Sequence, residues 1–329
     1  MTTGNQRQRG GSLRAFRYAL EYAALLVARE VFRHLPCERA VALGAGLGAA
    51  YARLRGPRTG HAAINLALAF PEWSAAERRR VLVASFANLG RCIAEVFLLQ
   101  GSHRERLLDG LTIEGLENYD AAKRASESGG MIVLTAHFGS WELCGAAMAQ
   151  RGYPLSVVHH GVENPHLDKM VSGWRRAANL EEIRLGRAAM GVFRGLAKGR
   201  VVTLLLDQNA RREEGLFAPF FGHLVLTRSA PAMIAMNRGV PVLPVFVYRV
   251  EGTSRHVVKM CPPLEMEPGG EDPDAALTRN VGRMNEAIET AIRAAPDHWL
   301  WPHRRFKTRP EGDPSFYPRS RRRRRRGSS

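Results

Sequence analysis

The feature that most constrains the fold is an alternation of short apolar runs with helical patterns, which begins near residue 112. Five runs rich in Val, Ile and Leu have the length and composition of buried strands. Segments with helical apolar periodicity lie between most of them, and a long one follows the last. This order predicts an α/β domain with a largely parallel sheet flanked by helices. The expected strands are 131–136, 155–158, 201–206, 240–247 and 256–260, and the expected helices are 141–151, 165–178, 188–198, 230–238 and 274–294.

The first hundred residues have a different pattern, which predicts helices only. Ser74 and Glu77 form a capping-box pattern ahead of a long helix. The stretch 16–32 is mostly apolar, but its charges interrupt it before the roughly 18 to 20 residues that a spanning helix needs. A helix there presents a broad apolar face, so it either lies in a membrane interface or packs on the domain core.

The chain therefore divides into four expected parts. Residues 1–12 and the Arg-rich end 318–329 have the composition of disordered segments. Residues 13–110 form a helical region with a membrane-associating helix, and residues 111–317 form the α/β domain.

Charge points to an anionic partner. The 329 residues contain 48 Lys and Arg against 31 Asp and Glu, which gives a net charge of +17. Seven arginines lie in the last eleven residues, and the rest of the chain still carries +10. A hydrophobic fraction of 45% with 24% charged residues excludes a wholly disordered chain and a polytopic membrane protein. Phosphate, a membrane face or an acidic protein is the expected partner.

Several common site patterns do not apply. The four cysteines show no CxxC spacing, so neither a zinc site nor a disulfide framework is indicated. Gly44, Gly46, Gly48 and Ala49 match a loose dinucleotide-binding pattern, but no strand precedes them. Small residues that let two helices, or a helix and lipid, approach closely explain this stretch better.

The sequence His137-Phe-Gly-Ser-Trp-Glu142 follows the first long apolar run and carries the clearest chemical signal. It places His137 at the carboxyl end of a buried strand, where open α/β sheets bind ligands. With Gly139 as a permissive turn residue, the imidazole can fold back onto Glu142. One ring nitrogen then donates to the carboxylate and the other is left as a general base. By itself the spacing is weak, since about one chance match is expected, and a strand-end histidine paired for packing is the alternative.

Other residues supply context for this pair. Asp207 and Gln208 follow the strand 201–206 and place a second polar pair at the same sheet edge. In the apolar loop 215–222, Phe217, Phe220 and Phe221 either line a channel for a hydrocarbon chain or belong to the core, and residue type alone favours the core.

The segment 301–310 interleaves aromatic and basic residues, among them Arg304 and Arg305. It forms either a solvated basic surface or a binding site for phosphates and an acidic carrier.

At these residues the chain resembles the late acyltransferases of lipid A biosynthesis, the lauroyl and myristoyl transferases within the wider lysophospholipid acyltransferase group. The resemblance runs over about residues 15–317, and the 137–142 and 301–310 blocks together make it specific. The matching blocks are 65–71, 137–142, 164–175, 207–208, 220–222 with Thr227, and 301–310.

This resemblance implies a glycerol-3-phosphate acyltransferase-like fold and transfer of an acyl chain from acyl carrier protein, or from acyl-CoA, to a lipid A precursor. His137 then looks like the catalytic base, Glu142 its partner, and Arg175 and Asp207 supporting charges. It also implies an anionic glycolipid acceptor, a location on the cytoplasmic face of the bacterial inner membrane, and no metal or other cofactor. The polyarginine tail is not part of the family pattern.

Three alternatives stay open at this point. Similar sequences acylate phosphatidylinositol mannosides and other glycolipids or lysophospholipids. The same His–Glu pair acting on water makes an acyl-thioester hydrolase. A non-enzymic basic protein that binds membrane or nucleic acid is a rival from another class, although no nucleic-acid module is recognisable, so no nucleic-acid partner is expected.

Overall fold

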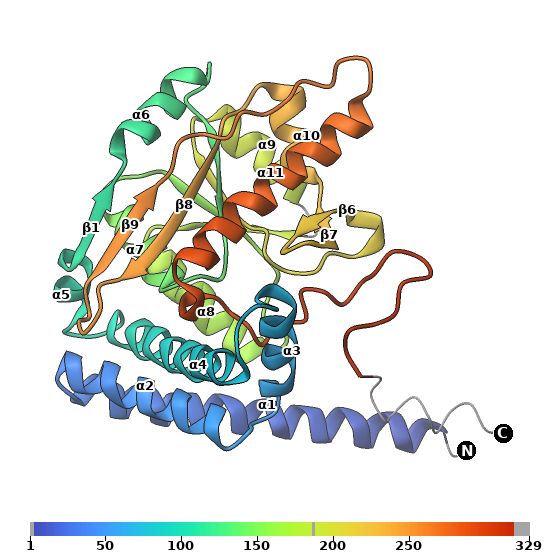
Figure 1. The fold of residues 1–329 in the computed structure, drawn as a ribbon. Coiled ribbons are helices and arrows are strands. Elements are labelled where there is room, and N and C mark those ends of the chain that lie inside the picture. The colour runs from blue at the N-terminus through green and yellow to red at the C-terminus, as the bar shows by residue number, and fades with distance from the viewer. Residues whose placement is uncertain (1–2, 186–187, 319–329) are drawn as a thin grey trace.

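The computed structural model describes residues 3–185 and 188–318, and a sheet of seven strands forms its centre (Figure 1). The strand order is β1-β9-β8-β2-β5-β3-β4, and every neighbouring pair is parallel except β8 with β9. This confirms the predicted α/β fold with a mostly parallel sheet. The strands are β1 Leu111–Glu114, β2 Met131–Thr135, β3 Leu155–His159, β4 Glu181–Arg184, β5 Val201–Leu205, β8 Val242–Arg249 and β9 His256–Met260.

Helices cover both faces of this sheet. Because successive side chains of a strand point to opposite faces, Val202 packs into one core and Val201 into the other. The first core contains side chains of α3, α9, α10 and α11, and the second contains side chains of α6 and α7. The helices are α1 Thr3–His34, α2 Cys37–Arg53, α3 Thr59–Ala69, α4 Ala75–Leu98, α5 Arg104–Asp109, α6 Leu116–Ala125, α7 Trp141–Gln150, α8 Pro165–Ala177, α9 Ala188–Ala197, α10 Ala230–Arg238 and α11 Pro273–Ala294, with short 3-10 turns at Arg212–Glu214 and Pro296–His298.

Two features of the α/β region differ from the prediction. Strands β1 and β4 were not predicted, because each has only four residues and an edge position that demands little apolar character. The predicted apolar loop 215–222 is wrong: strands β6 Gly215–Phe220 and β7 His223–Arg228 form an antiparallel hairpin there. Phe221 and Gly222 make its turn with φ of 48° and 73°, and two positive φ angles suit a tight hairpin.

The N-terminal region is helical, as predicted, and Ser74 and Glu77 form the expected capping box of α4. Gly44 and Gly48 of α2 lie against α4, where an added Cβ would collide with the carbonyls of Gly90 and Phe86. The small residues thus serve a close helix–helix approach, which confirms that interpretation. Among the residues described, only α4 is long and apolar enough to cross a membrane, and 61% of its most apolar stretch is buried inside the protein.

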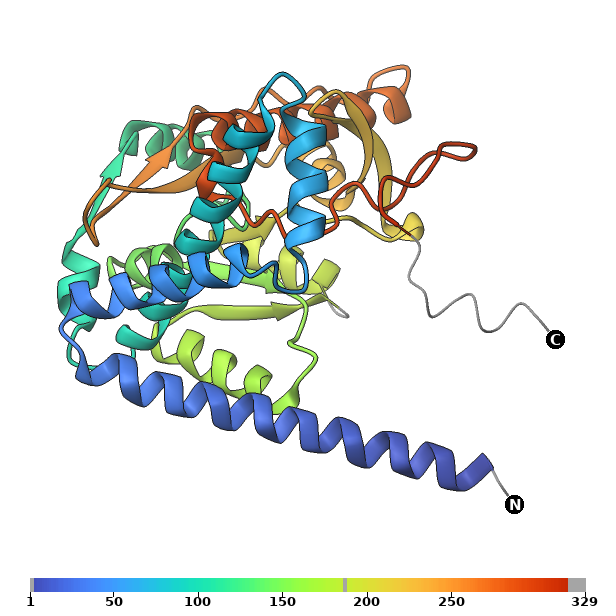
Figure 2. The same ribbon diagram turned by 60° about the horizontal axis from the view of Figure 1, so that its bottom comes forward.

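Helix α1 runs along the outside of the molecule and extends beyond it (Figure 2). It begins at Thr3, inside the segment 1–12 that we expected to be disordered, while the tail from residue 319 lies outside the described residues. The C-terminal part of α1 packs on the core through Leu25, Ala28 and the buried Phe32. Phe16, Leu20 and Val27 point outward instead and are 61–70% exposed, so packing on the core explains only part of the apolar face of α1.

Candidate active site

The end of strand β2 places His137 at the carboxyl edge of the sheet, as predicted. Gly139 follows with φ of 56°, and a Cβ there would collide with the carbonyl of Val247. Its amide donates to the carbonyl of His298 at 2.9 Å, and the carbonyl of His137 accepts from the amide of Leu300 at 3.0 Å. A glycine turn and a C-terminal segment thus fix the backbone on which the imidazole stands.

Asp207 holds the imidazole of His137. Its Oδ1 lies 2.9 Å from Nδ1 of the ring, and its Oδ2 accepts from the backbone amide of His137 at 3.1 Å. Oδ2 also accepts from the indole of Trp299 at 2.9 Å. Since Nδ1 must donate to the carboxylate, Nε2 carries the free lone pair, and the Gln208 amide nitrogen lies 3.3 Å from it.

The two pKa values are shifted in opposite directions. Burial lowers the pKa of His137, but the charge and hydrogen bond of Asp207 outweigh it, and the net result is a raised pKa. Burial raises the pKa of Asp207, but His137 and the Trp299 hydrogen bond bring it down to about 2. Asp207 is 2% exposed and stays ionised at neutral pH, so the pair stabilises an imidazolium on His137.

The predicted contact between Glu142 and His137 is not present in the structure. Glu142 lies in the first turn of α7 and forms a bidentate pair with Arg175 of α8 instead, at 2.5 and 3.3 Å. Helix α7 turns its first carboxylate toward α8, whereas Asp207 reaches the ring directly from the neighbouring strand β5. Glu142 still raises the pKa of His137 through its charge. The structure thus brings His137, Glu142, Arg175, Asp207 and Gln208 together, with Asp207 rather than Glu142 on the ring.

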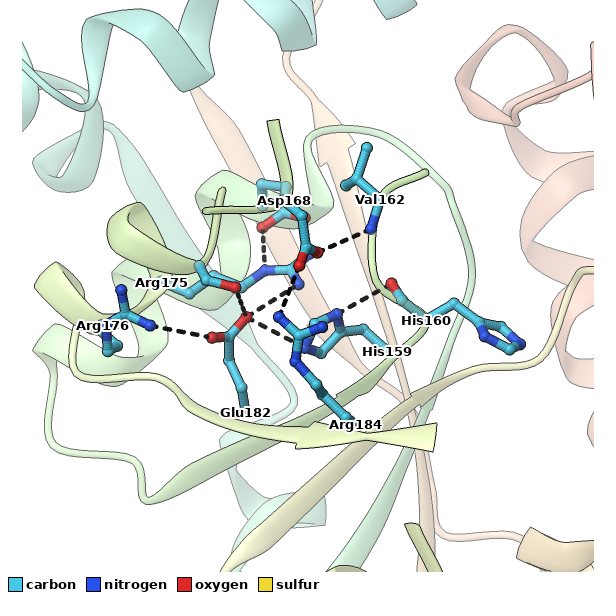
Figure 3. Close-up of polar contacts among 10 residues, drawn as sticks. His159, His160, Val162, Asp168, Arg175, Arg176, Glu182 and Arg184 are labelled. Carbon is cyan, nitrogen blue, oxygen red and sulfur yellow. Dashed lines mark hydrogen bonds and ion pairs between the residues drawn. The ribbon is translucent and has the colours of Figure 1, made fainter. Parts of the chain in front are cut away.

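Arg175 belongs to a wider polar network that sequence reasoning did not detect (Figure 3). Glu182 of strand β4 is 3.6 Å from Arg175 and accepts a hydrogen bond from Ser172 at 3.1 Å. The same carboxylate lies 3.2 Å from Nε2 of His159. The Arg175 guanidinium is therefore held between two carboxylates, which together raise its pKa, although burial opposes this. Its position is fixed from both sides.

A second set of contacts fixes the loop before α8 (Figure 3). Asp168 of α8 accepts from Arg184 of β4 at 2.7 Å and from the amide of Val162 at 2.8 Å. These bonds tie the start of α8 to the edge of the sheet, so the helix that carries Arg175 is held at both ends.

A cavity of about 360 Å³ adjoins this polar group. Its volume is within the usual range of small-molecule sites. Its polar lining residues, such as His137, Glu142 and Gln208, lie at the carboxyl edge of the sheet. Its apolar lining comes from residues on one face of four adjacent strands, including Val133, Leu155, Val157, Val201, Leu205, Leu243 and Val247. The cavity therefore runs along the sheet, and the span from Leu205 back to Val201 alone is about 13 Å at 3.3 Å per residue.

Two tyrosines line this cavity at the edge opposite His137. Tyr153 lies two residues before β3, which is parallel to its neighbours, so it lies at their amino edge. Its ring meets that of Tyr119 edge to face at 4.9 Å. Neither residue was predicted, because nothing in the sequence around them distinguishes a cavity wall from a core.

The three phenylalanines predicted for a hydrocarbon channel do not line the cavity. Phe220 and Phe221 are 1% and 4% exposed and pack into the core around Phe70 and Trp299. Phe217 is half-buried on strand β6, with the Arg212 guanidinium over its ring. The core alternative holds for Phe220 and Phe221, because the hairpin turns them toward α11 rather than toward the sheet edge.

The two arginines predicted as substrate-binding have different environments. Arg304 is exposed. Arg305 is fully buried and donates to the carbonyl of Gln208 at 3.0 Å, to Thr227 at 2.7 Å and to Asn285 at 3.0 Å. Burial lowers its pKa to about 10. Arg305 therefore supports the Gln208 backbone, and its buried side chain is not part of a solvated basic surface.

The fold and site together define an α/β enzyme whose histidine–carboxylate pair stands beside an apolar cavity. Residues 7–308 match the family described as bacterial lipid A biosynthesis acyltransferase. The chain belongs to this family and is an acyltransferase.

Curated relatives agree with this assignment. The chain is 31% identical to the lipid A biosynthesis palmitoleoyltransferase of Escherichia coli K12 over 277 residues, which cover 84% of this chain and 87% of the relative. It is 29% identical to the lauroyltransferase of the same organism over 84% and 87% of the two chains. Identity to the E. coli myristoyltransferase is 26%, over 84% and 83%. The three relatives are named for three different acyl groups, so the comparison identifies the family but not the acyl chain that is transferred.

Proposed function

We propose that this protein transfers a fatty acyl chain from acyl carrier protein to a hydroxyl of a lipid A precursor, with His137 as the general base. The observation that carries the proposal is the unprotonated Nε2 of His137 beside a long apolar cavity, because acyl transfer needs both a base and a place for the chain. Membership of the lipid A acyltransferase family supports the acceptor class.

The proposed reaction is a direct transfer. The acceptor hydroxyl attacks the thioester carbonyl while its proton moves to Nε2 of His137. As the tetrahedral intermediate collapses, the carbon–sulfur bond breaks and the imidazolium returns the proton to the thiolate. Asp207 orients the ring and stabilises the imidazolium, and Glu142 adds its charge from α7. Arg175 is already bound by Glu142 and Glu182, so its part is to hold Glu142 in place.

Membrane and carrier partners belong to the same proposal. The outward apolar residues of α1, such as Phe16 and Leu20, suit the interface of a cytoplasmic membrane surface where a lipid acceptor resides. The net charge of +10 outside the tail suits an acidic carrier and a phosphorylated lipid. The chemistry draws on protein side chains alone, without a metal or another cofactor.

An assay with purified protein tests the reaction against its rivals. We expect acyl carrier thioester to be consumed only when a lipid A precursor is present, with the acylated lipid as product. Release of fatty acid at the same rate without acceptor would identify a hydrolase instead. Acylation of phosphatidylinositol mannoside in place of the lipid A precursor would contradict the acceptor. Mass spectrometry of glycolipids from cells lacking the gene should show the loss of one secondary acyl chain.

The end of the cavity opposite His137 should select the acyl chain length. Tyr153→Ala removes one wall at the end opposite His137, so we expect products to shift toward longer chains. Gly145→Leu adds bulk along the wall formed by α7 and should shift products toward shorter chains. The position suits a helix former, and a Cβ there meets only ordinary contacts of 3.7 Å with Leu180. Competition among thioesters of several lengths, read by mass spectrometry, measures the shift. An unchanged product ratio in both variants would exclude this cavity as the chain site.

A further inference from the structure

Helix α3 and the C-terminal segment form one surface beside the active site. Asn65 of α3 is fully buried and donates to the carbonyls of Trp301 at 2.7 Å and His303 at 2.6 Å. The Tyr317 hydroxyl donates to the same amide from the other side of the segment. Figures 1 and 2 show α3 beside this segment in both views. Residues 58–65 and 301–305 are thus held in a fixed relation.

This surface carries positive charge without a partner. His61 lies on the same face of α3 as Asn65, which follows it by four residues, and Arg58, at the N-cap of the helix, precedes His61 by three. Arg58 and Arg304 are exposed, and within residues 3–185 and 188–318 neither guanidinium takes part in an ion pair or a side-chain hydrogen bond. Burial lowers the pKa of His61, and Arg304 and then Arg58 lower it further. The carbonyl of His303, the residue before Arg304, accepts from Asn65, so Arg304 on one segment and His61 and Arg58 on the other occupy adjoining positions.

His303 connects this surface to the catalytic pair. Burial lowers its pKa to about 4; the charge of Asp207 opposes this shift, and the charges of His137, Arg305 and Arg58 add to it. Its Nδ1 is buried and has no hydrogen-bond partner among the described residues. Arg305, the residue after Arg304, donates to the carbonyl of Gln208 at 3.0 Å, and the Gln208 amide nitrogen lies 3.3 Å from Nε2 of His137, so the segment that carries Arg304 reaches the catalytic pair.

We propose that Arg58 and Arg304, with His61, bind a phosphate group of one substrate and thereby place that substrate against His137. Guanidinium groups bind phosphate oxygens through paired, charge-assisted hydrogen bonds, and two of them on adjoining segments present donors from two directions. Naming the substrate rests on the proposed function. The phosphate belongs either to the acceptor glycolipid or to the prosthetic arm of the acyl carrier, and the kinetic experiment below separates the two.

Phosphate binding is tested without catalysis, so that it stands or falls separately from the proposed reaction. Inorganic phosphate and glucosamine 1-phosphate are titrated into the His137→Ala protein while the imidazole NMR signals of His61 and His303 are followed. We expect saturable shifts and a higher pKa of His61 in the complex, because a bound anion favours the imidazolium. Arg304→Gln should weaken binding at least tenfold. Arg39→Gln, which removes an exposed arginine of α2, should leave it unchanged.

Arg58 needs its own variant because its φ of 105° strains any residue with a side chain. Arg58→Gly removes the charge and suits this angle, so the fold is kept. We expect it to weaken phosphate binding at least tenfold as well. Equal affinity in the wild type, Arg58→Gly and Arg304→Gln, or no shift of His61, would overturn the proposal.

Kinetics then identify which substrate carries the phosphate. The acceptor is offered with and without its phosphate, and the donor as carrier thioester or as the phosphate-free N-acetylcysteamine thioester. A tenfold rise of KM in Arg304→Gln for the phosphorylated acceptor alone assigns the site to the acceptor. The same rise for the carrier thioester alone assigns it to the donor. Unchanged KM values for both phosphorylated substrates would refute a role in substrate binding.

Discussion

The His137→Ala variant is expected to fold normally and to lose about 10² to 10⁴ of its acyl-transfer rate, the usual effect of removing a positioned general base. The loss should appear in kcat rather than in KM, since the ring acts on the proton of the acceptor and the cavity that receives the chain stays intact. Single-turnover rates with the carrier thioester and the lipid A precursor measure it. Near-normal transfer by a folded His137→Ala protein would exclude His137 as the base.

Two further variants distinguish the roles of the carboxylates of Asp207 and Glu142. Asp207→Asn should be nearly as damaging, because an amide that donates to Nδ1 places the remaining proton on Nε2, where the base must be free. Glu142→Gln should cost less, since Asp207 still orients the ring. An effect of Glu142→Gln that exceeds that of Asp207→Asn would reverse these roles.

The pH profile gives an independent check on the same pair. A base must be unprotonated, so kcat/KM should fall as the pH drops through the raised pKa of His137, above the ordinary histidine value. In the residual activity of Asp207→Asn this acid limb should move to lower pH, because the carboxylate that raised the pKa is gone. An unmoved limb would mean that another group sets it.

The largest effect on stability is expected at Glu95. This α4 residue is fully buried and pairs with Arg249 of β8 at 2.5 and 2.9 Å. Glu95→Ala leaves the Arg249 guanidinium, whose side chain is 6% exposed, without its counter-charge. The expected loss is about 3 to 5 kcal/mol in the free energy of unfolding, measured by urea denaturation.

Glu38→Ala is the matched control for this measurement. It removes the acid of an exposed pair with Arg106 and should change stability by no more than about 1 kcal/mol. Similar losses in both variants would show that burial does not decide the value of the Glu95 pair.

The general architecture was predictable from the sequence because apolar periodicity follows directly from burial. The strands that were predicted to begin at residues 131, 155, 201 and 256 begin at those residues in the structure. The place of His137 was predictable for the same reason, since it directly follows a buried run. The hairpin at 215–228 was not predicted. An apolar run around a glycine is compatible with either a strand or a loop when its partner strand is unknown.

Local sequence did not show which side chains of the site contact one another. Glu142 is five residues from His137, yet the ring is held by Asp207, seventy residues away. Which carboxylate reaches the ring depends on β2 and β5 being neighbours in the sheet, and that order is set by the whole fold. The burial of Arg305 could not be predicted for a related reason: a basic residue in a basic segment is expected to be exposed, and only the fold shows that this segment passes between the hairpin and α11.

The contact between Trp299 and Asp207 has a consequence for how the enzyme comes into being during synthesis. The carboxylate that orients the catalytic ring receives one of its hydrogen bonds from a residue ninety-two positions further along the chain. The backbone of His137 is likewise paired with Leu300. A nascent chain that has released all seven strands from the ribosome therefore still lacks an assembled site. Catalytic competence arises only when Trp299 and Leu300 have emerged and docked, so the enzyme is inactive until translation has passed well beyond strand β9.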